Sequence, residues 1–588
     1  MVSTPQTSRR AFLTGATGAL AATSGCVGEI RSLVGRQRAS QLSLNIKTPP
    51  AGEDPYAVRI ANHVADNLSQ SGVETVVDPV SFDVLFRDIL INHDFDLYVA
   101  RYPSQGDPDE LRSMLYSSYG EESGWQNPFG FSSIEMDDAL DEQRTAESED
   151  RVRIVHEIQR QIVQSQPFTV IVFPDRIGAV RTDRFDGWPT GGLSAPTDYL
   201  QLERVGDTTT LNPLLRNERI TRNRNPLAAE YRNQGDLIGL LYEPLVRSLD
   251  DHDEPLPWLA RSIEWDETEP AAATIELRQT PWHDGESVTA HDVAFTYEFL
   301  QDTSLGKFDS PVPTSWRRGR ASLVESVSVH SDGQFRIEFV TPNREVAYRA
   351  LSAPILPEHI WRDRSESTDV AGIDIAGQTT EALVSANEEA IGNGPVQFDD
   401  AVTDESISFD VFEDHFLRTG EADGIPPRFV DDGAFDRIEF TVAPSHDAAV
   451  ELLVNDDADA SADGLQASVV PRIVRSEGVS LAIQQSDPFY HLGFNCRRSP
   501  MTDPRFRRIA ARHIDRAFIL EESMERYGLP SEVPLKQEWT PQDLDWSGEA
   551  TLPFLGENGE LNVEEAREAF REAGYQYEEE QLIRRGGS

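Results

Sequence analysis

The chain is poor in cysteine and in lysine, and it has no apolar run of the roughly 20 residues that a membrane span needs. Only two cysteines occur among 588 residues, so a disulfide framework is excluded. Of the 53 basic residues three are lysines, against 101 acidic residues, which gives a formal net charge of −48. A nucleic-acid-binding surface needs clustered basic residues, and this composition excludes one.

An acidic surface with so little lysine is typical of proteins that stay soluble in concentrated salt, where screening removes the self-repulsion of the charges. An ordinary acidic secreted protein is the alternative interpretation. At 38% hydrophobic and 9% aromatic residues the chain can bury a large core. Its length indicates more than one folding unit, because single cores stop growing near roughly 250–300 residues.

The first 26 residues read as an export signal. Arg9 and Arg10 stand before an apolar stretch too short to cross a membrane, which resembles a twin-arginine signal. Residues 23–26, Thr-Ser-Gly-Cys, resemble a lipobox, although Thr23 departs from the usual Leu or Val. We expect Cys26 to be lipidated and residues 27–40 to be a tether to the outer face of the membrane. An unprocessed free cysteine is the alternative.

The mature chain begins with a β-α-β-α-β pattern of hydrophobicity. The predicted strands and helices are, in order, 42–46, 56–70, 73–77, 82–91 and 95–100. This order predicts a parallel sheet, and ligands of such sheets lie outside the carboxyl ends of the strands. The loops at those ends are 47–54, 78–81 and 101–109.

Capping residues mark several later helices. Thr289 with Asp292 has the pattern of a capping box, Asp503 precedes a proline, and Asn562 stands three residues before a glutamate. The predicted helices are 149–165, one after 289, one after 503, and 563–573; strands are predicted at 168–173, 274–277, 335–340 and 438–442.

Four stretches carry recognisable motifs in a fixed order. They are Tyr242-Glu243-Pro244-Leu245-Val246 with Pro257-Trp258-Leu259-Ala260, Leu277-Arg278 to Val293, Gly392-Asn393-Gly394-Pro395, and Asn495 to Arg516. Together they resemble the family 5 extracellular solute-binding proteins, the dipeptide-, oligopeptide- and nickel-binding components of ABC importers. The departures, Gln279-Thr280, Asn393 and Cys496, remove no capping or turn residue.

The order of the segments departs from that of the family. There, a helix ending in Ala-Gly-Tyr is followed by a further βαβ unit, whereas here Ala573-Gly574-Tyr575 stands near the end of the chain. The landmarks that should follow it are found at 41–205 instead. Because each landmark occurs once, we expect a circular permutation, with the strand at 42–46 beside the end of helix 563–573. A mis-assembled or fused gene is the alternative.

The resemblance implies an α/β, two-lobe, periplasmic-binding-protein-like (type II) fold with mixed sheets and a hinge. One lobe should comprise 166–490, and the other 41–165 with 491–588. It further implies a monomeric, lipid-anchored extracellular protein without a cofactor, which captures peptides or similar small solutes and delivers them to the permease subunits of an ABC importer. A secreted enzyme on a two-lobe scaffold and a metal or metallophore carrier are the alternatives.

The resemblance also places ligand-binding residues in the loop 101–109. In peptide-binding members a carboxylate in this loop neutralises the α-amino group of the ligand, which implies that role for Asp107; a plain turn residue is the alternative. We expect Asp109 to cap the helix that follows, and Tyr102 to stack against the ligand. The remaining candidates are Gln105, Tyr242 and Tyr490.

Signals for other chemistry are weak. His283-Asp284 and His291-Asp292 suggest metal ligation only if further ligands converge on them; a turn for Asp284 and a helix cap for Asp292 are the simpler interpretations. Cys496 lies beside two arginines, but without a histidine partner a packed core residue is favoured over an activated thiolate. Phosphate-loop, G-x-S-x-G and HExxH motifs are absent from the sequence.

Overall fold

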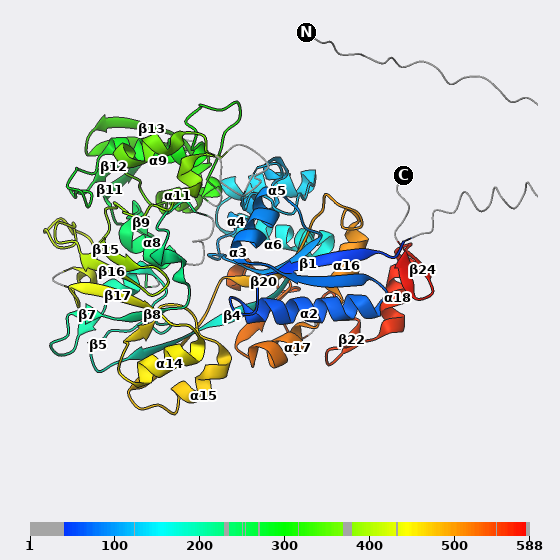
Figure 1. Cartoon of the computed structure of the whole chain (residues 1–588). Coiled ribbons are helices and arrows are strands. Elements are labelled where there is room, and N and C mark those ends of the chain that lie inside the picture. The colour runs from blue at the N-terminus through cyan, green and yellow to red at the C-terminus, as the bar shows by residue number, and fades with distance from the viewer. Residues whose placement is uncertain are drawn as a thin grey trace, which may run out of the picture.

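The computed structural model describes residues 40–122, 124–228, 235–249, 251–252, 254–267, 271–314, 317–368, 379–430, 433–548 and 550–583. Arg9, Arg10 and Cys26 lie outside them. The described chain forms two halves around one mixed sheet that runs through both (Figure 1). We call residues 40–173 with 489–583 the terminal half, and residues 174–488 the central half.

The terminal half is built on the strand order β4-β20-β3-β1-β2. β1 pairs in parallel with β2 and with β3, which confirms the parallel arrangement predicted from the β-α-β-α-β pattern. β20 runs antiparallel to β3 and to β4, so the sheet is mixed. The strands are β1 (Ser43–Thr48), β2 (Glu74–Pro79), β3 (Leu97–Tyr102), β4 (Phe168–Arg181), β20 (Phe489–Phe494) and β21 (Gly528–Pro530).

Helices cover both faces of this sheet. Leu97 and Val99 of β3 pack into one core with α2, whereas Tyr98 and Ala100 face the opposite core with α6, as the period of two in a strand requires. The helices are α2 (Pro55–Gln70), α3 (Phe82–Phe86), α4 (Glu110–Leu115), α5 (Ile134–Thr145), α6 (Ser148–Ser165), α16 (Pro504–Ala511), α17 (Arg516–Phe518) and α18 (Val563–Glu572), with π turns at Arg87–Ile91 and Ile519–Ser523.

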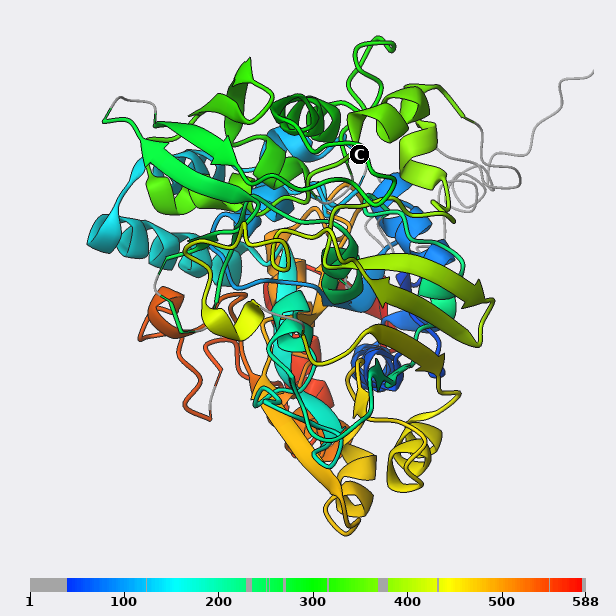
Figure 2. The same cartoon turned by 90° about the vertical axis from the view of Figure 1, so that its left-hand side faces the viewer.

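The central half continues the mixed sheet and adds a separate antiparallel one, β11-β12-β14-β13. Its strands in the mixed sheet are β7 (Thr210–Leu211), β8 (Pro213–Leu215), β15 (Val396–Val402), β16 (Ser406–Val411), β17 (Arg437–Val442), β18 (Ala460–Ser461) and β19 (Val479–Gln485); those of the separate sheet are β11 (Ala260–Trp265), β12 (Ala272–Leu277), β13 (Val324–Ser331) and β14 (Gln334–Phe339). Figure 2 shows this half toward the viewer.

Helices pack around the sheets of the central half, and α14 and α15 lie at its lower end (Figures 1 and 2). They are α7 (Pro196–Leu200), α8 (Gly235–Leu241), α9 (Ala290–Gln301), α10 (Arg318–Ala321), α11 (Arg344–Leu351), α12 (Glu358–Trp361), α13 (Glu381–Val384), α14 (His446–Val454) and α15 (Val470–Ile473). Short strand pairs are β5 (Phe185–Asp186) with β6 (Glu203–Arg204), β9 (Val246–Arg247) with β10 (Leu256–Pro257), β22 (Gly556–Glu557) with β23 (Glu560–Leu561), and β24 (Gln576–Glu578) with β25 (Gln581–Ile583).

The chain crosses between the halves in two adjacent strand segments. The first part of β4 pairs with β20 in the terminal half, and its last part pairs with β19 in the central half. The crossing therefore lies near Pro174 on one segment and near Asp487 on the other. The lobe boundaries predicted from the sequence, 165/166 and 490/491, stay a prediction.

Both ends of the described chain lie together at the far end of the terminal half (Figure 1). The main-chain N–H of Leu42 donates to the carbonyl of Leu582 at 2.7 Å, and Gln41 stands opposite Ile583 in an antiparallel bridge. The hairpin β24–β25 directly follows α18, so the first strand lies beside the end of that helix, as predicted. None of the helices in the described part of the chain combines the length and apolar character of a membrane span.

Candidate functional site

A cavity of about 1120 Å³ lies between the two halves. Its terminal wall comes from the loops that follow β1 and β3. Its central wall comes from α8, from α11 and from the segments that follow β8 and β18. The carboxyl ends of the parallel strands therefore open into the cavity, as the parallel pattern predicted. The lining holds eight arginines and eight carboxylates, although acidic residues outnumber basic ones 101 to 53 in the whole chain.

The loop after β1 is held by Asp54. Its carboxylate caps α2 by accepting the N–H of Ala57 at 3.0 Å, and it accepts the hydroxyl of Tyr490 at 2.9 Å. Burial raises the pKa of Asp54 and raises that of Tyr490 well above its ordinary value. The hydroxyl of Tyr56 accepts the N–H of Ala467, which ties this loop to the central half. Tyr490 therefore lines the cavity with its hydroxyl already bonded.

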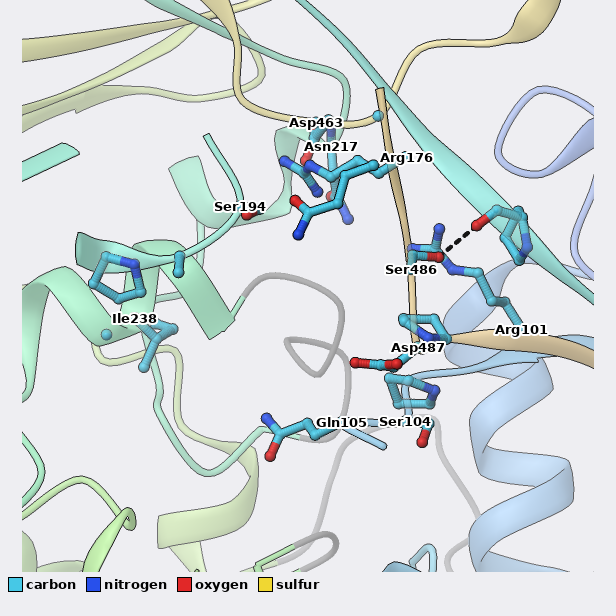
Figure 3. A pocket seen from close by; sticks show the side chains of 18 of the residues that line it. Arg101, Ser104, Gln105, Arg176, Ser194, Asn217, Ile238, Asp463, Ser486 and Asp487 are labelled. Atoms are coloured by element: carbon cyan, nitrogen blue, oxygen red, sulfur yellow. Dashed lines mark hydrogen bonds between the residues drawn. The ribbon is translucent and has the colours of Figure 1, made fainter. Parts of the chain in front are cut away.

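The loop after β3 is ordered by Glu110, the first residue of α4. Its carboxylate accepts the N–H of Gln105 at 3.0 Å and the hydroxyl of Ser104 at 3.0 Å. Burial raises the pKa of Glu110, against the opposing effect of Arg349. These bonds hold Gln105 at the surface of the cavity (Figure 3).

Arg349 of α11 in the central half reaches across to three carboxylates of the terminal half. Its Nε lies 3.2 Å from Asp107 Oδ2, its Nη1 2.9 Å from Asp109 Oδ2, and its Nη2 3.8 Å from Glu110 Oε1. Asp107 also lies 3.7 Å from the guanidinium of Arg151. Asp107 thus lines the cavity, but arginines of the chain itself already neutralise it.

Asp109 has a different role from the predicted one. It precedes α4 but its side chain makes no capping hydrogen bond; instead the fully buried carboxylate bonds Arg144 at 2.5 and 2.9 Å and Gln143 at 2.8 Å. Burial alone would raise the pKa of Asp109, but Arg144 and Arg349 outweigh it and hold the pKa below its ordinary value. The prediction of a capping side chain is wrong, because a bidentate partner is available from α5.

Polar groups of the central half form much of the opposite wall. Arg176, Asn217, Ser194 and Asp463 lie on one side of the cavity, and Ser486 and Asp487 lie across from them, beside Arg101 of β3 (Figure 3). Arg176 donates to the carbonyls of Leu193 and Ala462. Asp463 accepts the main-chain N–H groups of Arg216 and Asn217 at 2.6 and 3.1 Å. These bonds fix the side chains, so the wall presents a preformed polar surface.

Four of the five ligand-binding candidates predicted from the sequence line the cavity: Gln105, Asp107, Tyr242 and Tyr490. Tyr242 is buried, accepts a hydrogen bond from Asn387 at 3.0 Å, and has its pKa raised to about 12 by burial. Tyr102 is placed elsewhere. It packs in the core of the terminal half against Trp125 and Phe489, on the face of β3 that Tyr98 and Ala100 share.

The lining also contains residues that the sequence did not single out, above all Arg320 and Arg349. They lie in no motif, and Arg349 bonds Asp109 across 240 positions of the chain. No local sequence signal exists for such a contact, apart from the low lysine content, which makes nearly every basic group an arginine.

The alternative metal and thiol sites gain no ligands in the described part of the chain. His283 bonds the main chain of Gly392 and Gly394, and Asp292 accepts the N–H and hydroxyl of Thr289 at 2.8 and 2.9 Å, as its capping pattern predicts. Among the described residues no three His, Cys, Asp or Glu side chains converge as a metal site requires. Burial raises the pKa of the Cys496 thiol, against Arg507 and Arg497, which is the opposite of activation.

Comparison with known proteins decides the family. The model of the bacterial extracellular solute-binding proteins, family 5 (middle), matches residues 254–587, more than half of the chain. The chain belongs to this family. It is therefore a family 5 solute-binding protein with an α/β mixed-sheet fold, and the family comprises binding proteins rather than enzymes.

Curated relatives match over part of their length. The peptidoglycan-binding protein YepA of Agrobacterium fabrum is 27% identical over 316 residues, which cover 52% of this chain and 46% of that protein. The oligopeptide-binding protein AppA of Bacillus subtilis is 23% identical over 300 residues, 50% of this chain and 47% of that protein. The chain thus spans about half the length of the curated relatives it matches.

Solved structures align at low similarity. AppA of Bacillus subtilis in complex with a nonapeptide aligns with a TM-score of 0.45 and 18% identity, over 64% of this chain and 66% of that one. NikZ of Campylobacter jejuni in complex with Ni(L-His) aligns with a TM-score of 0.44 and 18% identity, over 65% and 66% of the two chains.

Proposed function

We propose that this family 5 protein captures oligopeptides in the cavity between its halves and delivers them to the permease subunits of an ABC importer. The observation that carries the proposal is the cavity itself. Its volume of about 1120 Å³ lies slightly above the roughly 300–1,000 Å³ of small-molecule pockets, and its walls are polar on both sides. An extended peptide offers main-chain donors and acceptors along its whole length, which suits such walls.

Binding then consists of recognition and closure, with no bond made or broken. The two halves would act as lobes that close around the solute, with the hinge at the crossing segments near Pro174 and Asp487. In support, the loops after β1 and β3 already contact the central half through Tyr56 and Arg349. A protein of this kind works as a monomer and needs no cofactor.

We further propose that a lipid on Cys26 holds the protein at the outer face of the membrane, after export by the signal at Arg9 and Arg10. In support, the described chain starts at the far end of the terminal half, away from the cavity (Figure 1). A tether leaving from that end keeps the cavity free for solute and permease. The acidic, lysine-poor composition supports work in concentrated salt.

We also propose that the order of segments in this chain is a circular permutation of the family's order. The contact between Leu42 and Leu582 and the exposed loop that follows β6 support this proposal. In that loop Gly206 has a φ of +100° and a Cβ added to it would meet no atom within 4 Å. The contact is where original segments would have been joined, and the loop is where original ends would have lain.

Native mass spectrometry of the purified protein tests peptide capture, because a closed binding protein retains its solute. We expect the wild type to carry peptide masses that vanish on denaturation. Gly464 lines the cavity and a Cβ there would meet no atom within 4 Å, so Gly464→Trp should fill the cavity without a local clash. This variant should lose the adducts. Gly333→Trp, in the open turn between β13 and β14, is the matched control and should keep them. Adducts that are metal complexes or sugars, or adducts that survive Gly464→Trp, would contradict the proposal.

A further inference from the structure

One end of the cavity is rich in arginine. Arg320 lies in α10, Arg317 is the residue directly before α10, and Arg349 lies in α11. All three line the cavity, and α10 packs against both α11 of its own half and α4 of the terminal half. Figure 1 shows α11 and α4 facing each other across the boundary between the halves. This end therefore lies where closure brings the halves together.

The charge of Arg349 is already balanced. Asp107, Asp109 and Glu110 surround its guanidinium at 2.9 to 3.8 Å. These carboxylates have further partners, since Arg144 binds Asp109 and Arg151 lies beside Asp107. Neither Arg349 nor Asp107 is therefore left with an unmet charge that a solute would have to satisfy.

Arg320 is in a different position. Its Nη1 donates to the carbonyl of Ser352 at 3.4 Å, and among the described residues no carboxylate lies within 4.0 Å of its guanidinium. It is enclosed by the protein yet keeps some exposure, as a side chain facing the cavity does. Burial and the nearby Arg349 lower the pKa of Arg320 to about 10, and Glu110 and Asp107 only partly offset this. Burial and Arg320 likewise lower the pKa of Arg317 to about 9.

Like charges held together away from bulk water raise the free energy of the empty site, and an anion placed among them lowers it. We propose that Arg320 receives an anionic carboxylate of the solute between α10 and α11, so that the protein selects peptides by an acidic group at this end of the cavity. The inference rests on the proposed peptide-binding function. It replaces the expectation that Asp107 selects the ligand through an ammonium group, because Arg349 already neutralises Asp107.

The carboxylate has two possible sources in a peptide, the C-terminus and an acidic side chain. Both present the same planar pair of oxygens, which the guanidinium fork binds in a bidentate manner. The overall charge of −48 repels an acidic solute at long range, but high salt screens that repulsion while a desolvated contact at Arg320 is screened much less. Selection at this end therefore remains effective in concentrated salt.

Calorimetric titration with four forms of penta-alanine tests the inference. The peptide is used with a free or acetylated N-terminus and with a C-terminal carboxylate or amide, in high salt. We expect amidation to weaken binding to the wild type roughly a hundred-fold and acetylation to change it little. A fifth probe, Ala-Ala-Asp-Ala-Ala amide, distinguishes the sources: affinity recovered by the aspartate assigns the site to side-chain carboxylates, and affinity not recovered assigns it to the C-terminus.

Two variants connect the effect to one residue. Arg320→Gln should bind the acid and amide forms of the peptide equally, and Arg320→Lys should keep a reduced preference for the acid. Arg153→Gln, an exposed arginine on α6, is the control and should behave as the wild type. The melting temperature of each empty variant is measured first, and removing a cation that has no carboxylate within 4.0 Å among the described residues should not lower it.

The outcomes separate the two proposals. Equal binding of acid and amide by the wild type, or a preference that survives in Arg320→Gln, would overturn the anion site and leave peptide binding intact. Weaker binding of the acetylated forms with no effect of amidation would restore Asp107 as the selecting group. Failure of the wild type to bind any of the five probes would overturn the proposed peptide-binding function, and the anion site with it.

Discussion

Arg349 determines what the two aspartates of the β3–α4 loop do. Asp109 is fully buried between Arg144 and Arg349, whereas the side chain of Asp107 is 29% exposed at the edge of the same cluster. A charge inside the protein depends on its partners, and removing one partner leaves the others desolvated and unpaired. Asp109 should therefore contribute more to the stability of the fold than Asp107 does.

Asp109→Asn should destabilise the protein by about 3–5 kcal/mol, because it leaves Arg144 and Arg349 buried with one fewer carboxylate. Asp107→Asn should cost about 1 kcal/mol or less, since the pair is partly exposed and Arg349 keeps two other carboxylates. Urea unfolding of both variants in the same salt checks this. If the Asp109 variant loses only the amount typical of a helix cap, the assignment of a buried ion-pair centre is wrong.

His513 should make stability depend on pH. Its ring is buried, and burial lowers its pKa to about 4 from 6.5. Between pH 6.5 and pH 4 the ring of His513 is therefore protonated in the unfolded chain but not in the folded protein. The stabilisation is complete above pH 6.5 and is lost as the pH falls toward 4, by about 2 kcal/mol at pH 5. The free energy of unfolding is measured at pH 7 and at pH 5. Between these pH values His513→Gln should lose about 2 kcal/mol less stability than the wild type. The control His291→Gln, at an exposed position, should behave as the wild type.

The positions of helices and strands could be predicted from the sequence because their signals are local. Asn562 caps α18 by accepting the N–H of Glu565, and Gly72 takes a φ of +101° at the end of α2, both at the expected places. The core position of Tyr102 could also have been predicted from the sequence. Tyr102 shares a face of β3 with Tyr98 and Ala100, and the period of two in a strand puts all three side chains in the same core. Arg320 and Arg349 could not be found this way, because the cavity joins segments that only the tertiary fold brings together.

At the scale of elements, α10 and α4 are in close contact across the boundary between the halves. Gly319 of α10 lies against α4, and a Cβ there would stand 2.2 Å from the hydroxyl of Ser113. The carbonyl of Gly319 also accepts a hydrogen bond from Arg144 at 3.4 Å. A serine hydroxyl can rotate away from one added methyl group, but a branched side chain needs more room than that.

Gly319→Val should therefore act as a wedge between the halves, at a cost of about 1–3 kcal/mol to the closed arrangement. Small-angle X-ray scattering should show a larger radius of gyration, and peptide affinity should fall by roughly ten-fold or more. Adding Ser113→Gly should restore both, because it removes the clashing hydroxyl. Gly333→Val, at an open turn of the same half, should have no effect. An unchanged radius in Gly319→Val would show that α10 and α4 do not limit closure.

At the scale of the whole molecule, the two ends of the described chain belong to one structural unit. The first strand and the last hairpin share a core with α2 and α18, so residues more than 500 positions apart stabilise each other. The hydroxyl of Tyr577 donates to the carbonyl of Ser71 at 2.8 Å, and the N–H of Leu582 donates to the carbonyl of Gly72 at 2.8 Å. Stability of the terminal half thus depends on contacts between segments that lie far apart in the chain.

If a circular permutation explains this order, the chain should fold equally well when it is opened at the loop after β6 and closed at its present ends. The variant begins at Asp207, runs to Ser588, continues directly into Ser40 and ends at Gly206, with residues 1–39 left out. Gln41 and Ile583 are already paired, so residues 584–588 suffice as the connection. The opened loop carries an exposed Val205 and an unobstructed Gly206, so cutting it removes no packed side chain.

We expect the stability of this variant to lie within about 1 kcal/mol of that of the wild type, and its peptide affinity to be unchanged. The same joined chain opened between Pro174 and Asp175, in the strand that crosses between the halves, is the control and should fail to fold. If the variant opened at Gly206 aggregates, or folds without binding, the present order of segments is required for the fold and the permutation has to be abandoned.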